Sequence, residues 1–200
     1  MEKSKLNKSP EPIITIIVIA WALLAFLLGY KKAFSNLPLP FFGLTVIVII
    51  SSLIILYLKN NAFKNWCDSI PLKYIALFHS WRILAGWAFL EFTGILPDTF
   101  INNAAYGDII SGFLGLSMFI FGFTKRNYFI FNIIGLLDFI IAVGTGLTLT
   151  ILGETKMAII AELPLIMIPL FGVPLSGFTH FISLNRLLKA KTKGYNEIIE

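Results

Sequence analysis

Charged residues are scarce in this 200-residue chain, and their scarcity excludes an ordinary water-soluble domain. Only 14% of the residues are charged, whereas 57% are hydrophobic, and the mean hydropathy is +0.84. A soluble globular domain carries roughly 25% charged residues, because these residues cover its surface against water. The composition therefore predicts a protein whose surface faces lipid.

The chain has one cysteine and none of the common catalytic motifs. Cys67 is the one cysteine, so no intrachain disulfide can form, and its neighbours match no thiol-catalysis or haem-attachment pattern. We interpret it as a bystander thiol at the membrane surface. The sequence contains no His-Glu-x-x-His, no Gly-x-Ser-x-Gly and no phosphate-binding loop. Metal-dependent hydrolysis is therefore not expected, and the sequence leaves open whether the protein is an enzyme.

The net charge is +5, and the positions of the Lys and Arg residues along the chain indicate the class of partner. Lys and Arg cluster between the hydrophobic runs and near the chain ends, and no basic patch is interleaved with stacking aromatic residues. We therefore expect contact with the anionic head groups of a lipid bilayer, and no nucleic acid partner.

Apolar runs of membrane-spanning length recur along the chain. A helix needs about 20 apolar residues to cross the hydrocarbon layer, and a lone segment in lipid must be helical even when it is rich in Val and Ile. We predict an all-α fold, a polytopic transmembrane helical bundle with about six spans in one transmembrane domain covering residues 1–200. The predicted spans are residues 13–30, 40–58, 73–93, 104–123, 128–152 and 157–188. The last span contains three prolines, so it must tilt, kink or project beyond the bilayer.

Positive charge predicts the orientation of these spans. With both termini in the cytoplasm, twelve Lys and Arg residues fall on the inner side and three on the outer side. The inner residues are Lys3, Lys5, Lys8, Lys59, Lys64, Lys73, Lys125, Arg126, Arg186, Lys189, Lys191 and Lys193, and the outer ones are Lys31, Lys32 and Lys156. We therefore expect cytoplasmic termini and, because no transit-like leader is present, residence in a prokaryotic plasma membrane.

Several polar side chains fall inside the predicted spans, where such groups are costly and usually face the bundle interior. Arg82 and Asp138 each lie roughly 15 Å along their spans at 1.5 Å per residue, so we predict that they pair. His79 and His180, the two histidines, fall at one similar depth. Small residues beside them, such as Gly86 in the same span as Arg82, are expected to let helices approach closely. The candidate ligand-binding residues are His79, Arg82, Asp108, Asn132, Asp138, Glu162 and His180.

A longer pattern of residues runs through the third to sixth predicted spans. It comprises His79, Arg82, Gly86, Leu96-Pro97, Phe100, Gly107-Asp108, Gly112, Asn132, Gly135, Asp138, Pro164, Pro169, Pro174, His180 and Arg186. In this pattern the chain resembles a family of small multi-pass membrane proteins from prokaryotes. The resemblance implies a helical membrane protein and brings no assigned activity.

Four functional hypotheses follow from the polar residues. The first is binding or transport of a small molecule, ion or proton. The row of polar and charged side chains that includes Arg82 and Asp138 would hold or conduct it. Six helices without a repeat are few for a carrier, unless the protein forms a homo-oligomer. The second is a redox protein that holds b-type haem iron between His79 and His180. His180 could equally hydrogen-bond Ser176 or Ser183.

The remaining two hypotheses differ in what the polar residues do. In a membrane-embedded enzyme acting on a lipid-like or quinone-like substrate, His79 or Asp108 would be the acid or base and Arg82 would hold an anionic group. In a structural subunit, the polar residues would serve only helix assembly. No metal ion other than haem iron is expected at these residues, because two histidines with scattered carboxylates are a poor ligand set.

Overall fold

The computed structural model describes residues 11–122 and 124–190, and within these residues the regular structure is entirely helical. The predicted all-α fold is therefore confirmed. The elements are α1 (Glu11–Tyr30), α2 (Leu39–Lys59), α3 (Asn61–Ser69), α4 (Leu72–Phe78), α5 (Trp81–Leu90), α6 (Asp98–Phe121), α7 (Lys125–Ile151), the 3-10 helix η1 (Thr155–Ala161), the π-helix η2 (Ile168–Gly172) and α8 (Val173–Lys189). The predicted inner charges Lys3, Lys5, Lys8, Lys191 and Lys193 lie outside the described residues.

Four of the helices are long and apolar enough to cross a membrane. They span Pro12–Tyr30, Leu39–Lys59, Asp98–Phe121 and Lys125–Ile151. The first, second and fifth predicted spans match these helices within a few residues. The Val- and Ile-rich segment of α2 is helical, as expected from the requirement that a segment in lipid satisfy its own backbone hydrogen bonds.

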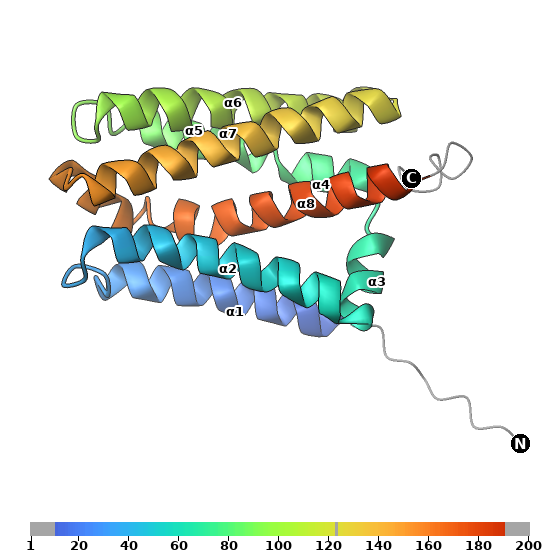
Figure 1. Cartoon of the computed structure of the whole chain (residues 1–200), viewed down its shortest axis with the longest axis horizontal. Coiled ribbons are helices and arrows are strands. Elements are labelled where there is room, and N and C mark those ends of the chain that lie inside the picture. Colours follow the sequence, from blue (N-terminus) through green and yellow to red (C-terminus); the bar gives the residue numbers. More distant parts are fainter. Residues whose placement is uncertain (1–10, 123, 191–200) are drawn as a thin grey trace, which may run out of the picture.

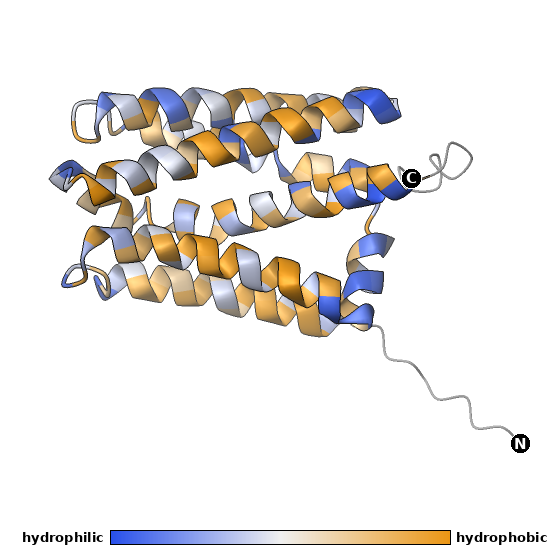
Figure 2. Cartoon of the chain, in the orientation of Figure 1, coloured by the Kyte–Doolittle hydropathy of each residue, from blue (hydrophilic) through white to orange (hydrophobic). Residues whose placement is uncertain are grey.

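The helices run along one long axis and form two groups (Figure 1). One group contains α4, α5, α6 and α7, and the other contains α1, α2 and α8, with α8 lying between α7 and α2. The start of α1 and the end of α8 lie at one end of the bundle, beside α3, and η1 lies at the opposite end. Hydrophilic residues gather near these ends, whereas the middle of α1 and α2 is largely hydrophobic (Figure 2).

The third predicted span, residues 73–93, is not one helix. It is interrupted at His79 and Ser80, where backbone hydrogen bonds tighten from i+4 to i+3, with Ser80 N donating to Leu77 O at 2.9 Å. The two parts are α4 and α5, and α5 ends at Leu90 in place of residue 93. The interruption could not be read from hydropathy, because the residues on both sides are equally apolar.

The sixth predicted span, residues 157–188, is also not continuous. Its first part is η1, which is followed by a turn, the π-helix η2 and then α8. Proline explains the break, since Pro164, Pro169 and Pro174 each lack the N–H that a continuing helix needs. Pro174 cannot donate to the carbonyl of Leu170, and Trp21 Nε1 from α1 donates to that oxygen at 3.0 Å. A neighbouring helix thus satisfies the polar group at the kink.

The fourth predicted span begins at a different residue in the structure, and a short helix precedes the third span. α6 begins at Asp98, six residues before the predicted residue 104, because Pro97 ends the preceding turn and Asp98 suits the positive end of the helix dipole. Asp108 therefore lies about three turns inside α6, whereas the predicted span 104–123 would place it close to the start of its helix. The stretch between the second and third predicted spans contains the short helix α3, which Asn60 caps by accepting a hydrogen bond from Phe63 N at 3.0 Å.

Glycines allow α5 and α6 to pack almost backbone against backbone. A Cβ atom added at Gly86 would lie 2.4 Å from Ala105 O, and one added at Gly112 would lie 2.7 Å from Ile83 N. Side chains on either helix would hold the backbones apart, so these positions require glycine. The predicted role of Gly86 and Gly112 in close helix approach is confirmed, and this packing fixes Arg82 on α5 against Asp108 on α6.

Candidate functional site

Arg82 is the centre of a buried ionic cluster formed by three helices. Its side chain is 3% exposed and projects from the first turn of α5. Its Nε donates to Asp108 Oδ1 on α6 at 2.7 Å, and its Nη2 donates to Asp138 Oδ2 on α7. The predicted pair between Arg82 and Asp138 is therefore present, and Asp108 joins it as a second carboxylate.

Asp138 packs against α6 at Gly107, which has no side chain to occupy the space of the carboxylate. A Cβ atom added at Gly107 would lie 1.5 Å from Asp138 Oδ1, so any larger residue would push this carboxylate out of its position beside Arg82. The Asp138 side chain is 10% exposed, close to the 8% of Asp108. The Gly107-Asp108 dipeptide thus supplies one carboxylate and the space for the other.

His180 on α8 completes the shell around Arg82, and its hydrogen bonds define its protonation state. Asn132 Nδ2 donates to Tyr128 O at 2.7 Å, which turns Asn132 Oδ1 toward His180 Nδ1 at 2.9 Å. Since a carbonyl oxygen only accepts, His180 Nδ1 must carry a proton. Arg82 Nη1 lies 3.4 Å from His180 Nε2, and because arginine only donates, Nε2 must accept. His180 is therefore neutral in this arrangement, and it does not bond Ser176 or Ser183.

His79 lies beside His180 at the interruption between α4 and α5. The two imidazole rings stack with their centroids 3.9 Å apart and an interplanar angle of 24°. Thr179 donates its hydroxyl hydrogen to Leu175 O at 2.8 Å, so it accepts from His79 Nε2 at 3.2 Å. His79 Nδ1 is then a buried acceptor with no hydrogen-bond donor among residues 11–122 and 124–190.

The geometry of these two histidines does not fit a haem between them. Axial ligation places one imidazole nitrogen on each face of the porphyrin, with the iron between the two rings. Here the rings are stacked face to face, their nitrogens bond Arg82, Asn132 and Thr179, and both side chains are fully buried. A porphyrin cannot enter this contact without moving α8 away from the junction of α4 and α5, so this arrangement does not favour the haem hypothesis.

The cluster carries an excess of negative charge when its carboxylates are ionised. Arg82 contributes one positive charge, Asp108 and Asp138 contribute one negative charge each, and His180 is neutral. No further Lys or Arg makes a salt bridge with either carboxylate in the described part of the chain. One uncompensated charge in a buried site costs several kcal/mol, so the site favours uptake of a proton or another small cation.

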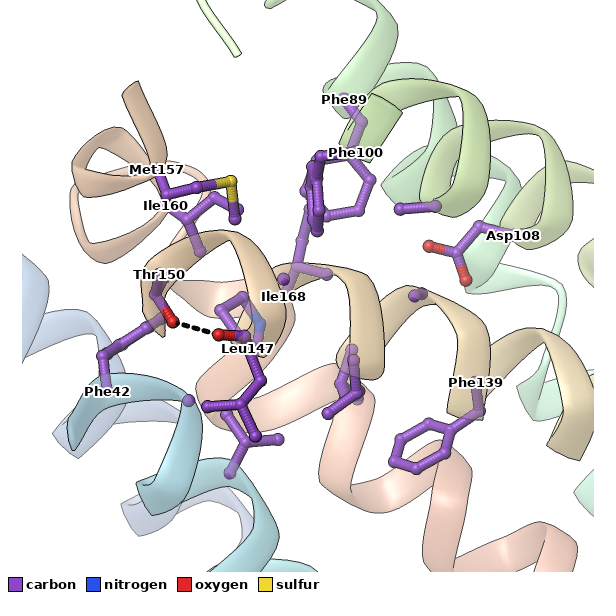
Figure 3. Close-up of a pocket in the computed structure, with 18 of the residues that line it drawn as sticks. Phe42, Phe89, Phe100, Asp108, Phe139, Leu147, Thr150, Met157, Ile160 and Ile168 are labelled. Carbon is purple, nitrogen blue, oxygen red and sulfur yellow. Dashed lines mark hydrogen bonds between the residues drawn. The ribbon is translucent and has the colours of Figure 1, made fainter. Parts of the chain in front are cut away.

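A cavity of about 80 Å³ opens beside the cluster (Figure 3). Its wall comes from α2, α5, α6, α7, α8, η1 and η2 and is largely apolar. Among its described lining residues, the charged ones are Arg82 and Asp108. The carboxylate of Asp108 is directed toward the space between Phe100 and Phe139. The cluster is thus in contact with an apolar chamber on the side of the bundle that leads toward η1.

The structure brings together six of the seven candidate residues predicted from the sequence. His79, Arg82, Asp108, Asn132, Asp138 and His180 form one connected group. Glu162 lies apart, at the end of the bundle that holds η1, where it pairs with Lys32 at 3.3 Å. Both of these side chains are substantially exposed, so Glu162 does not belong to the buried site.

A second polar cluster, which the sequence did not predict, joins α2, α3 and α8. Tyr57 OH donates to Asp68 Oδ1 at 2.7 Å and accepts from Asn185 Nδ2 at 2.8 Å, and Lys64 donates to the other Asp68 oxygen at 2.5 Å. The hydrogen bond from Lys64 to Asp68 raises the pKa of Lys64. Cys67 is buried next to this cluster, and burial raises the pKa of its thiol to about 12. The Lys64–Asp68 pair has the i,i+4 spacing of a helix and could have been predicted from the sequence, whereas Asn185 lies 128 residues from Tyr57 and could not.

The fold and the site define an all-helical protein with an Arg-Asp-Asp cluster buried at the meeting point of its helices. The chain belongs to the family described as "Domain of unknown function (DUF8737)", whose model matches residues 39–188. The resemblance to an uncharacterised family is therefore confirmed, and the match extends to α2, which the residue pattern did not include. Neither the curated proteins nor the solved structures contain a significant match to the chain.

Proposed function

We propose that this protein is a multi-pass membrane protein that binds a proton at the Arg82–Asp108–Asp138 cluster and moves that proton, alone or with a small molecule, across the bilayer. The observation that carries the proposal is the charge of the cluster. Two carboxylates share one guanidinium, and the neighbouring histidine is neutral. Away from water, the favoured way to remove the extra negative charge is to protonate one carboxylate.

The membrane assignment is supported by composition and by the path of the chain. Four helices are long and apolar enough to span a bilayer, and the α4–α5 and η2–α8 segments run parallel to them (Figure 1). These segments complete six passes, with α3 at the cytoplasmic end. Lys59, Lys64, Lys125 and Arg126 then face the cytoplasm, consistent with the excess of positive charge on that side of a prokaryotic plasma membrane.

A proton fits this site better than a metal ion does. Protein-bound metals need at least three well-placed ligands, and the described residues contain no group of three His, Cys, Asp or Glu side chains that could hold one. Arg82 also occupies the position between the two carboxylates where a cation would lie. A proton needs only one carboxylate oxygen and no additional space.

The site is also built to exchange a proton, because its two carboxylates face different surroundings. Asp108 lines the cavity, whereas Asp138 lies in the α6–α7 contact beside Gly107. The charged or titratable groups that face them are Arg82 from α5 and His180 from α8, with His79 stacked behind His180. Arg82 bonds both carboxylates, so a proton on either one leaves the other as its ionic partner.

Proton binding can be measured directly on the purified protein. The C=O stretching band of a protonated, buried carboxyl group should appear in infrared difference spectra and disappear as the pH is raised. It should be absent from Asp108→Asn or Asp138→Asn, or from both, because one carboxylate fewer leaves the cluster neutral without a proton. Glu162→Gln is the matched control, since it removes an exposed carboxylate and should leave the band unchanged.

Transport is tested in liposomes that contain an internal pH dye. Wild-type protein should acidify or alkalinise the lumen under an imposed membrane potential, and Asp138→Asn should lose this flux at equal protein incorporation. Identical flux and identical infrared bands in wild type, Asp108→Asn and Asp138→Asn would overturn the proposal.

A further inference from the structure

We infer that the cavity beside Asp108 is a binding site for a small lipophilic ammonium ion, and that this ion exchanges with the proton of the cluster. The inference rests on the proposed proton site and names the molecule that would use it.

The wall of the cavity suits an apolar body with one cationic group. Aromatic rings from α2, α5, α6 and α7 line it, namely those of Phe42, Phe89, Phe100 and Phe139. Aromatic faces attract cations and also accept alkyl groups, particularly where water is excluded. Pockets for small molecules commonly combine such an apolar wall with a few polar groups that fix the orientation of the ligand.

Asp108 offers the polar group that such a ligand would meet. Its Oδ1 accepts from Arg82 Nε, whereas its Oδ2 accepts no hydrogen bond from any residue that the structure describes. Its carboxylate is directed into the cavity (Figure 3). A free carboxylate oxygen surrounded by aromatic rings is complementary to an ammonium group and not to an anion.

Charge balance links the ligand to the proton. The cluster needs one added positive charge, and either a proton on a carboxylate or an ammonium ion beside it supplies that charge. When an ammonium ion R–NH₃⁺ binds next to protonated Asp108, the carboxyl O–H bond breaks, the proton leaves to water and the carboxylate pairs with the ammonium. One cation enters and one leaves, so the charge of the site does not change.

The volume of the cavity limits the ligand to a few carbon atoms. An apolar cavity of about 150 Å³ accommodates benzene, and this cavity measures about 80 Å³. The ethylammonium ion, with half the non-hydrogen atoms of benzene, is therefore a suitable probe, and ethanol is its neutral counterpart of almost equal length. The two molecules differ mainly in the charge that should be recognised by Asp108.

The experiment titrates detergent-purified full-length protein with ethylammonium in a weakly buffered solution that contains a pH dye. Wild type should bind the probe and release close to one proton for each ion bound, whereas ethanol should release none. Asp108→Asn should bind the ion at least about tenfold more weakly, because it loses a desolvated charge pair. Ala142→Leu, which places a larger side chain in the cavity, should also lose binding, whereas Ala20→Leu on the exposed face of α1 should not.

The outcomes separate this inference from the proposed function. A protein that titrates its buried carboxyl group but binds no ethylammonium, or binds it equally well after Asp108→Asn, overturns the inference and leaves the proton site standing. Binding of the ion without proton release shows that no proton was held in the cluster, and it overturns both the exchange and the proposed function. Equal binding of ethanol overturns the recognition of charge.

Discussion

Replacing Arg82 by glutamine is the sharpest test of the ionic cluster, because it removes the one positive charge that Asp108 and Asp138 share. Both carboxylates would remain buried, with side chains 8% and 10% exposed, and neither would have a cation. Removing one partner of a buried ion pair costs about 3–5 kcal/mol. For a chain of this size each kcal/mol lowers Tm by about 2–4 °C, so we expect a decrease of about 6–20 °C.

The pH dependence of this variant distinguishes charge from packing. Protonation removes the unpaired negative charges, so the loss of stability in Arg82→Gln should be largest at about pH 8 and should shrink toward about pH 5. Thermal unfolding in detergent, followed by tryptophan fluorescence, gives both values. Adding Asp138→Asn to Arg82→Gln should restore part of the stability, since it removes one unpaired carboxylate.

Arg126→Gln is the control, because Arg126 is exposed near the start of α7. If Arg82→Gln lowers Tm no more than Arg126→Gln does, or by the same amount at both pH values, the reasoning about uncompensated charge is wrong.

Three further predictions concern packing and chemistry elsewhere in the chain. Gly135→Ala should lower the free energy of unfolding by about 1–3 kcal/mol, because its Cβ would lie 2.3 Å from the imidazole of His180. Gly144→Ala is the control on the same helix: its Cβ would meet nothing within 4 Å, and the free energy of unfolding should rise by up to about 1 kcal/mol. Since burial raises the pKa of the Cys67 thiol to about 12, the thiolate is absent at neutral pH, and mass spectrometry should show maleimide labelling only after unfolding in detergent. Trp21→Phe should cost about 0.5–1.5 kcal/mol, measured as a lower Tm, because it removes a hydrogen bond to a backbone carbonyl at the proline kink.

The sequence predicted the composition of the site better than the shape of the helices that hold it. Arg82 and Asp138 could be paired in advance, because both are charged and fall at the same depth along apolar runs. The predicted span 104–123 placed Asp108 close to the start of its helix, whereas α6 begins at Asp98 and carries Asp108 deeper, to the level of Arg82. An error of six residues at a helix boundary shifts a side chain by about 9 Å, enough to change its partner.

Long-range partners account for most of what the sequence could not give. The stacking of His79 on His180 depends on the interruption of the helix at Ser80, for which hydropathy carries no signal. The cavity likewise depends on residues from seven helical elements and on the turns that proline imposes before α8. Glu162 was grouped with the site because it is acidic and near an apolar run, yet it pairs with Lys32 on the surface.

The contacts within one group of helices differ in kind from the contacts between the two groups. Both ion pairs of Arg82 lie within the group that contains α4, α5, α6 and α7. The polar contacts from that group to α8 are neutral or involve only one charged partner: Trp81 to Ser176, His79 to Thr179, and His180 to Asn132 and Arg82. A sliding motion along this boundary would therefore widen or narrow the cavity without separating opposite charges, so the cavity can change shape while the ion pairs of Arg82 stay intact.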